Sequence, residues 1–469
     1  MPWRESFRPV GMQRVALLAS REGLRDLLVA VADEGTVELD EVRGEGETGP
    51  PTPAALVLQR LQSAERVQPT LTRTAPDLEG WERGGRVDLI AGEAQVEQRA
   101  AVAVTRGSVA GLTGWMPSDA LPRLARRASD LGAAVVAMPR PQRAEPPTLL
   151  PSRGSAGEFA PLVETYATVP YEDVNVSVLA GLAYVVMFGM MFADAGHGAL
   201  LLLAAVAVRV GWWRRLAGLR RVWLFLAGAG LASIVFGVLY GEFFGPTGVV
   251  PVVWLKPLDQ PLLLLGAAVA FGALLLAGAY ALGTVNRFRE GGWRAAAYSS
   301  SGLAGATVFL GLAMLAGGLY LGVSWLALTG GLLALVGLVL AYVGLVAEAG
   351  GGGAAATFSV VELVDVVVRL GANVVSFARL AAFGLTHAAL GAVVFAGAVA
   401  AWRHGWVGAI AAIVLFIGGN ALTFALEGVV AGIQALRLEY YELFSRIFIR
   451  EGRPFRPWHV PLAVSEASC

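Results

Sequence analysis

From about residue 175 onward, the chain consists of long runs of apolar residues separated by short polar loops. The runs lie at roughly 176–193, 198–213, 222–240, 261–284, 299–321, 324–347, 373–402 and 406–438. A helix needs about 20 residues to cross the hydrocarbon core of a bilayer, and several runs reach or exceed that length. The pattern predicts about eight transmembrane helices, and the last two are long enough that they are either tilted in the membrane or extend beyond the lipid.

The N-terminal part of the chain has shorter alternations of apolar and polar residues. Residues 10–42 indicate a strand, an amphipathic helix closed by Gly35, and a second strand. A charged helix is expected around 56–66, strand-like apolar runs within 99–117, and a capped helix and strand over 118–140. These short elements predict a small α/β domain.

Composition supports this division and excludes other classes. Hydrophobic residues make up 56% of the chain and charged residues only 15%, whereas soluble domains carry about 25% charged residues. The fold class is therefore a mainly α polytopic membrane protein, with an α/β domain and connector at 1–174 and a transmembrane domain with a tail at 175–469. A formal net charge of zero gives no support for nucleic-acid binding, and the single cysteine, Cys469, excludes an internal disulfide and a cysteine-ligated metal cluster.

Arginines between the apolar runs predict the topology. They occupy two alternate loops and the C-terminal tail, namely Arg209, Arg214, Arg215, Arg220 and Arg221, then Arg287, Arg289 and Arg294, then Arg446, Arg450, Arg453 and Arg456. Cytoplasmic loops of membrane proteins carry an excess of Lys and Arg. With eight spans, both termini and the α/β domain are expected in the cytoplasm.

Two of the predicted spans contain charged or titratable residues where lipid would disfavour them. Arg379 lies within the run 373–402, and centring an arginine in hydrocarbon costs about 2.5–3.5 kcal/mol on insertion scales. His387 follows Arg379 by eight residues, and Arg437 follows Glu427 by ten in the last run. Four such groups in adjacent spans suggest a path for charge transfer.

Helical rise converts these spacings into depths. If the seventh span runs outward, His387 lies about 12 Å nearer the outside than Arg379, at 1.5 Å per residue. The eighth span then runs inward, which places Glu427 about 15 Å outward of Arg437. The two arginines are therefore expected at one depth, and His387 and Glu427 at another depth above them.

Acidic residues precede Arg379 on its cytoplasmic side. Asp365 is fourteen residues earlier, about 21 Å toward the cytoplasm if the helix is continuous. Glu362 and Asp365 are one helical turn apart, so that both carboxylates would face the inner mouth of a path. Arg369 places a cation in the same region, and the sequence offers no role for it.

Several segments together resemble a known family. SFARLAAFGLTHAAL, LEGVVAGIQALRLEYYELFSRIFIREGRPFRPW, FGMMFADAGHG, GWMP and PTLLPS are similar to the membrane stator subunit of V-type and A-type rotary ATPases, called subunit a, subunit I or the 116 kDa subunit. The resemblance implies partners: a rotor proteolipid ring, peripheral stalk subunits, a central stalk or collar subunit, and the lipid bilayer.

The resemblance also implies roles for the charged residues. Ions, either H⁺ or Na⁺, would enter by one half-channel, ride the ring and leave by the other. Arg379 resembles the essential arginine and Arg437 the supporting one, while Glu427 and His387 resemble outer half-channel groups. Asp365 takes the position of an inner half-channel acid, with Glu362 beside it. ATP chemistry would belong to other subunits, since no Walker motif occurs, and we expect no cofactor and no metal.

The chain departs from this family in its N-terminal half. Relatives carry a longer domain with a helical hairpin between two lobes, whereas only about 175 residues precede the first expected span. We therefore predict a compact lobe without a long coiled arm, its helical middle reduced to little more than 56–66, which changes how peripheral stalks would attach.

Other interpretations of the charged groups remain open. The two arginines could form structural ion pairs, His387 could bond between helices, and Glu427 could pair with Arg437. Asp365 and Glu362 could be a solvated face, and Asp194 and Glu242 interfacial caps or packing groups.

A different class of protein also remains open. A secondary ion-coupled transporter would bury charges too, but it should show internal repeats, and only a short echo between 188–194 and 236–242 is found. A non-conducting membrane scaffold would have no use for charges matched in depth across two spans.

Overall fold

The computed structural model describes residues 9–40, 52–61, 67–141, 144–150, 159, 162–163, 165–166, 168–212, 218, 220, 222–448 and 450–463. Their contacts form two compact units. One, the helical unit, comprises the described residues of 150–451. The other, the sheet lobe, comprises those of 9–149 together with 452–463.

The sheet lobe is built on an antiparallel sheet. Its strands are β1 (Met12–Ser20), β2 (Glu38–Leu39), β3 (Val104–Arg106), β4 (Val109–Pro117) and β5 (Ala134–Met138). The order is β2-β4-β1-β5, with β3 paired to β4. Because β4 lies between β1 and β2, the connection through helix α2 (Leu24–Glu34) is a split βαβ unit.

The predicted strand, helix and strand at the start of the lobe are confirmed. Burial alternates along most of β1, as expected for a strand with one face on the core. Helix α2 ends at Gly35, which adopts a left-handed conformation with φ 59° that glycine tolerates without steric cost. The later helix and strand also form, as α6 (Leu121–Asp130) and β5, although α6 has no side-chain cap.

The helical middle of the lobe is larger than predicted. Besides α3 (Pro53–Leu61), it contains α4 (Leu78–Arg83) and α5 (Val87–Ala101), so the expectation of little beyond 56–66 is wrong. Part of that predicted segment, 62–66, lies outside the described residues. The longest helix of the lobe, α5, has 15 residues, about 22 Å. No long coiled arm therefore occurs in the part of the lobe that the structure describes.

The C-terminal tail belongs to the sheet lobe, whereas the sequence grouped it with the transmembrane domain. Trp458 is 9% exposed in the lobe core, and its indole Nε1 donates to Gln95 Oε1 at 3.1 Å. The amide of Trp458 donates to the carbonyl of Val37 at 2.9 Å, and that of Val460 to Ala32 at 3.1 Å. The few apolar residues of this proline-rich tail show no helix or strand periodicity, so the sequence did not predict that the tail packs in the sheet lobe.

We expect Trp458→Ala to destabilise the sheet lobe by about 3–5 kcal/mol, because it removes a large buried aromatic side chain and leaves a cavity. Hydrogen exchange of the amides of β1 and α2 in the full chain should accelerate. Arg456→Ala is the matched control, since its side chain is exposed and its hydrogen bond to Glu38 comes from the backbone. Equal exchange in the two variants would contradict this role of the tail.

The helical unit contains the apolar segments. Its helices are α8 (Ser177–Met191), α9 (Ala195–Val210), α10 (Trp223–Tyr240), α11 (Pro261–Tyr298), α12 (Leu303–Leu321), α13 (Ser324–Glu348), α14 (Gly353–Ser376), α15 (Ala378–Trp402), α16 (Gly405–Leu438) and α17 (Ser445–Ile447), with a π-helical segment η2 (Glu439–Phe444) before α17. Each predicted apolar run coincides with a helix. Six helical segments in the described residues are long and apolar enough to cross a membrane, whereas α8 and α9 are shorter. The polytopic membrane fold is thus confirmed, and eight crossings remain a prediction.

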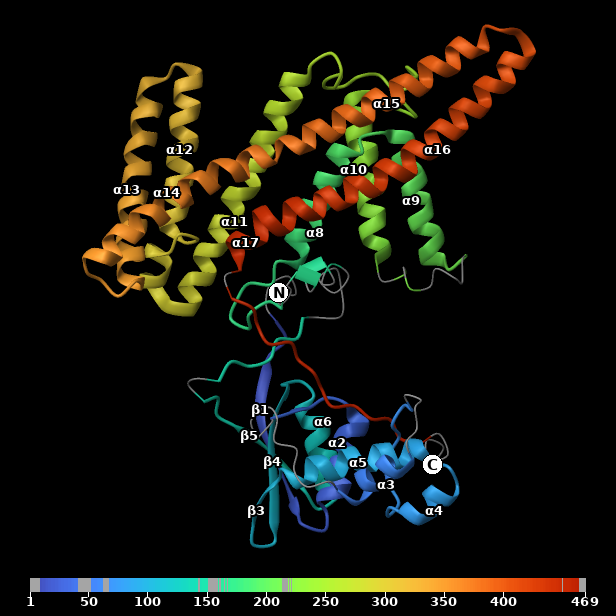
Figure 1. The fold of residues 1–469 in the computed structure, drawn as a ribbon, viewed down its shortest axis with the longest axis vertical. Coiled ribbons are helices and arrows are strands. Elements are labelled where there is room, and N and C mark those ends of the chain that lie inside the picture. The colour runs from blue at the N-terminus through green and yellow to red at the C-terminus, as the bar shows by residue number, and fades with distance from the viewer. Residues whose placement is uncertain are drawn as a thin grey trace. The chain divides into compact units, whose positions relative to one another are not determined.

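The two C-terminal apolar segments are the longest. Helices α14 and α15 meet at Phe377 and form one segment of 50 residues, and α16 continues through η2 and α17 for 43 residues. Figure 1 shows α15 and α16 running side by side, oblique to the α12–α13 hairpin. The sequence predicted two long apolar runs here, 373–402 and 406–438, but not the extension of the first through α14.

Glycines allow the helices to approach closely. A Cβ atom on Gly311 of α12 would lie 2.3 Å from the amide nitrogen of Ala334, and one on Gly330 of α13 would lie 2.4 Å from that of Leu315. Small residues at such positions allow close backbone contact in membrane bundles. The high glycine content therefore reflects helix packing here.

Candidate functional site

His387 and Glu427 form a buried pair between the two long helices. His387 Nδ1 is hydrogen-bonded to Glu427 Oε2, which joins α15 to α16. Only 4% of His387 and 8% of Glu427 is exposed. The helical spacing predicted that these residues share one depth, and their contact agrees with that. Glu427 has no ion pair with Arg437 in the described residues, so this alternative is not what the structure shows.

Arg379 lies eight residues before His387 and is anchored by three hydrogen bonds. Its Nε donates to the carbonyl of Ser376 at 3.0 Å, and its Nη2 to Ser376 Oγ at 2.8 Å. Nη2 also forms an ion pair with Glu442 Oε1 at 3.1 Å. With 23% of its side chain exposed, the guanidinium is held firmly but still reaches the surface of the chain.

Glu442 joins Arg379 to two further polar residues. The side-chain amide of Asn373 is oriented with its nitrogen toward Glu442. In this orientation the nitrogen donates to Glu442 Oε2 at 2.9 Å, and the amide oxygen accepts from Arg446 Nη2 at 2.9 Å. Glu442 belongs to η2, and π-helical turns within helices are frequent at functional sites. The network binds the end of α14, the start of α15 and η2 together.

Arg437 lies on an exposed apolar stripe of α16. The stripe consists of Leu422, Leu426, Val429 and Ile433, which are each more than half exposed, and continues to the exposed Arg437. Spacings of three and four residues place them on one helical face.

Asp365 and Glu362 are not brought into the Arg379 network. Asp365 forms an ion pair with Arg369 at 2.6 Å, one turn along α14, and both side chains are substantially exposed. Glu362 is exposed as well. This i,i+4 pair gives Arg369 a partner that the sequence analysis had not assigned, and such exposed pairs contribute little to stability.

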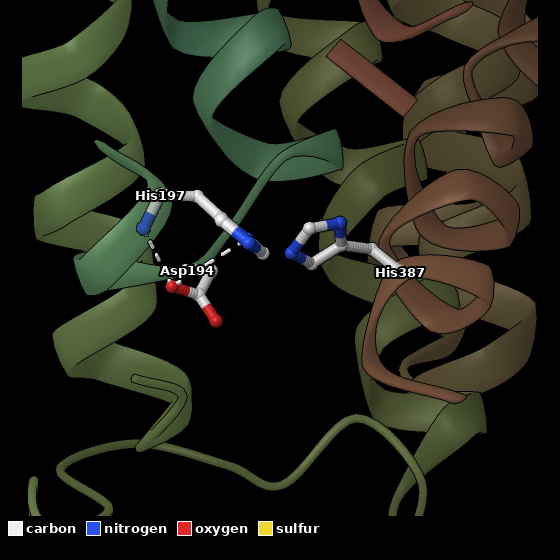
Figure 2. A group of neighbouring side chains, drawn as sticks. All are labelled: Asp194, His197 and His387. Atoms are coloured by element: carbon white, nitrogen blue, oxygen red, sulfur yellow. Dashed lines mark hydrogen bonds and ion pairs between the residues drawn. The ribbon is translucent and has the colours of Figure 1, made fainter. Parts of the chain in front are cut away.

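Asp194 and His197 lie beside His387 at the start of α9. Asp194 caps this helix: Oδ1 accepts from the amides of His197 at 2.8 Å and Phe244 at 3.0 Å, and Oδ2 accepts from Gly245 at 2.9 Å. Its predicted capping role is confirmed. Figure 2 shows the imidazole rings of His197 and His387 pointing at each other, with the Asp194 carboxylate beside them. Their ring centroids are 5.6 Å apart.

The two echoed segments of the sequence meet at this cluster. The amide of Ala195 donates to the carbonyl of Glu242 at 3.0 Å, which places the second acidic residue beside the first. The pKa of Glu242 is raised to about 7, mainly because its carboxyl group is buried and secondly because the charge of Asp194 is nearby. The C-terminal ends of α8 and α10 therefore lie next to a group of buried acids and histidines.

Sequence reasoning missed His197, Glu442 and Glu439. The carboxylate of Glu439 is fully buried and lines an apolar cavity of about 260 Å³ with residues of α8 and α11, and it forms no hydrogen bond with described residues. The signals were present, since the segment EYYE holds two glutamates and DAGH pairs an acid with a histidine at a spacing of three. Their contacts come from other helices and could not be read locally.

Comparison with known proteins identifies relatives. The model of the V-type ATPase 116kDa subunit family matches residues 100–247. A-type ATP synthase subunit I of Thermococcus kodakarensis is 26% identical over 76% of this chain and 55% of its own length, and that of Halobacterium salinarum is 29% identical over 67% and 51%. The vacuolar proton translocating ATPase 100 kDa subunit of Dictyostelium discoideum is 32% identical over 28% and 18%.

The chain spans about half the length of the curated relatives it matches. The apolar helices of the helical unit agree with similarity to a membrane subunit. The chain is thus similar to the V-type ATPase 116kDa subunit family over residues 100–247 and to A-type ATP synthase subunit I over two thirds to three quarters of its length.

Proposed function

We propose that the chain is the membrane stator subunit of a V/A-type rotary ATPase. It would form two ion half-channels against a rotor ring and couple translocation of H⁺ or Na⁺ to ATP hydrolysis or synthesis, with nucleotide sites on other subunits. The observation that carries the proposal is Arg379, which is bonded to Ser376 and Glu442, lies eight residues before His387 of the buried His387–Glu427 pair, and is still partly exposed.

The proposed topology has eight crossings, through α8, α9, α10, α11, α12, α13, the combined α14–α15 segment and α16. Both termini and the sheet lobe would then lie in the cytoplasm, consistent with the arginine-rich loops. In the complex, the lobe is the part available to peripheral stalk subunits and to a central stalk or collar subunit.

Arg379 and Arg437 would act as the barrier between the half-channels. Their guanidinium groups keep their protons under all physiological conditions, so they provide a fixed positive charge. A rotor carboxylate passing them would be held in its deprotonated form, because an opposite charge nearby favours ionisation. The same charge would repel a cation moving directly across.

The rotor would dock on the exposed face of α16. An apolar stripe ending in Arg437 suits a helix that is apolar except for one carboxylate, and Arg379 is partly exposed as well. Charge complementarity in an apolar surface selects register as well as partner. Lipid alone would gain nothing from an exposed arginine at this depth.

The outer half-channel would lead past Asp194, Glu242, His197, His387 and Glu427. All five are buried within the unit, and their oxygens and ring nitrogens can exchange protons or hold an ion. By the depth calculation, His387 is about 12 Å outward of Arg379.

The inner half-channel would lead from Asp365 and Glu362 toward the Glu442 network. Asp365 and Glu362 are accessible at the mouth, where their charge would attract cations. Glu442 is bonded to Arg379 and to Asn373, so Glu442 and Asn373 would supply the polar groups nearest to the barrier.

Cysteine accessibility tests this arrangement. In a Cys469→Ser background, His387→Cys and Glu427→Cys should react with an impermeant thiol reagent added outside, and Asp365→Cys with reagent added from the cytoplasm. Arg379→Cys should react least from either side, because a continuous water path there would dissipate the ion gradient.

Two further positions calibrate the experiment. His404→Cys, between α15 and α16, should be labelled only from outside, and Asp130→Cys, in the sheet lobe, only from the cytoplasm. Labelling of position 365 from outside, or of 387 and 427 only from the cytoplasm, would show that the half-channel roles are reversed.

A further inference from the structure

We propose that Asp194, His197 and His387 form a binding site for a divalent transition-metal ion of the Zn²⁺ class. One ligand atom from each of these residues lies within 4.8 Å of the others, and all three residues are buried. They come from the start of α9 and from α15, so the site forms only when these helices pack together (Figure 2). The sequence analysis had expected no metal.

His197 is the side chain that most needs a ligand. It is 1% exposed, and neither ring nitrogen has a partner at hydrogen-bond geometry among the described residues, although the backbone of Asn420 lies near the ring. Its Nδ1 is 3.7 Å from Asp194 Oδ1, beyond hydrogen-bond distance. Since buried polar atoms in proteins are nearly always paired, an imidazole left open in this way points to a missing partner in the space between the rings.

His387 is oriented as a metal ligand would be. Its Nδ1 is engaged by Glu427 Oε2, and Figure 2 shows the other nitrogen of the ring turned toward His197. Metal-bound histidines almost always use their second nitrogen to bond a carboxylate or carbonyl, which fixes the tautomer and the ring orientation. Glu427 takes that supporting position here.

Asp194 retains the capacity to bind an ion while it caps α9. Oδ2 accepts one backbone amide, from Gly245, so a lone pair of this oxygen is left for a cation. The main-chain bonds hold the carboxylate in place, and ligands positioned in this way need little reorganisation.

The geometry requires only small side-chain movements. Donor atoms about 2.0–2.1 Å from a tetrahedral ion lie about 3.4 Å apart, so separations of up to 4.8 Å must close by about 1.4 Å at most. Rotation of the unpaired His197 ring provides this, because no hydrogen bond to a described residue opposes it. Three protein ligands leave one position of the ion for water.

The donor set and the charge select the ion. Imidazole suits Zn²⁺ and related transition metals, whereas Mg²⁺ and Ca²⁺ prefer oxygen ligands. Asp194 and Glu427 are both buried in this region, and a divalent cation would offset negative charge there.

Metal binding would obstruct the outer half-channel, and this consequence rests on the proposed function. An ion ligated by His387 occupies the residues that would pass H⁺ or Na⁺ toward the rotor, so Zn²⁺ on the outer side would inhibit transport. Binding itself does not depend on that function and can be measured on the chain alone.

The test uses the full chain with Cys469→Ser in lipid nanodiscs, washed with chelator. Isothermal titration with Zn²⁺ should show one site per chain, and Mg²⁺ should give no signal. X-ray absorption at the zinc edge should show two imidazole nitrogens and carboxylate or water oxygens at about 2.0–2.1 Å. This measurement needs no substitution and is therefore independent of variant folding.

The four histidines of the chain provide matched variants. His197→Asn and His387→Asn should each weaken Zn²⁺ binding at least about tenfold, as does loss even of residues supporting a metal ligand. His404→Asn and His459→Asn should bind as the parent chain does, because these residues lie outside the cluster. No saturable site, a spectrum with fewer than two imidazoles, or equal loss in all four variants would overturn the proposal.

Discussion

Replacing Arg379 with alanine is expected to abolish ATP-coupled ion transport while the complex still assembles. The substitution removes the fixed charge at the proposed barrier, so a rotor carboxylate would have no counter-charge and ions could leak between the half-channels. Coupled transport and passive leak can be measured in vesicles containing the reconstituted complex. We expect transport to fall to background and the leak to rise.

The conservative variant makes the test sharper. Arg379→Lys keeps a charge, but a single ammonium cannot reproduce the planar fork that reaches both Ser376 and Glu442, so transport should remain severely impaired. Arg369→Ala is the control: this arginine is exposed and makes an i,i+4 pair of small energetic value, so transport should stay near the parent level. Near-normal pumping by Arg379→Ala would remove Arg379 from the mechanism.

The fold was predictable where local pattern decides structure. Apolar runs identified most of the long helices of the helical unit, because lipid-spanning helices must be continuous and apolar, but the run 373–402 left out nearly all of α14. In the sheet lobe, the alternation of apolar and polar residues indicates strand β1, and Gly35 indicates the end of helix α2. The packing of residues 452–463 into the sheet lobe was not predictable. These residues contain a few apolar side chains without a helix or strand periodicity, which gives no indication of where they pack.

Part of the site was also predictable, and the reason is geometric. His387 and Glu427 lie on continuous helices, so a rise of about 1.5 Å per residue places them at one depth. After Leu438 that arithmetic fails, because η2 replaces the regular advance of roughly 100° per residue by a wider turn. The sequence could not reveal whether Glu439 or Glu442 faces Arg379. His197 was missed because its neighbours come from another part of the chain.

The structure assigns different environments to these two glutamates. Glu442 uses one oxygen for Arg379 and the other for Asn373, so its carboxylate is fully engaged. Glu439 is fully buried, and both of its oxygens lack a partner in the described residues. Neutralising substitutions at these two positions, three residues apart in the chain, therefore separate the effect of a charge at the proposed barrier from the effect of a buried carboxylate in general.

Glu442→Gln is expected to lower coupled transport at least about tenfold, whereas Glu439→Gln should leave it near the parent level. Glutamine offers one acceptor oxygen where Arg379 and Asn373 each require one, and losing a hydrogen bond to a charged group costs about 1.5–3 kcal/mol, equivalent to a tenfold or larger change in rate. Glu439→Gln removes no ion pair from the described residues. Transport in vesicles, normalised to assembled complex, measures both. Equal rates in the two variants would show that Glu442 does not hold Arg379 in its working position.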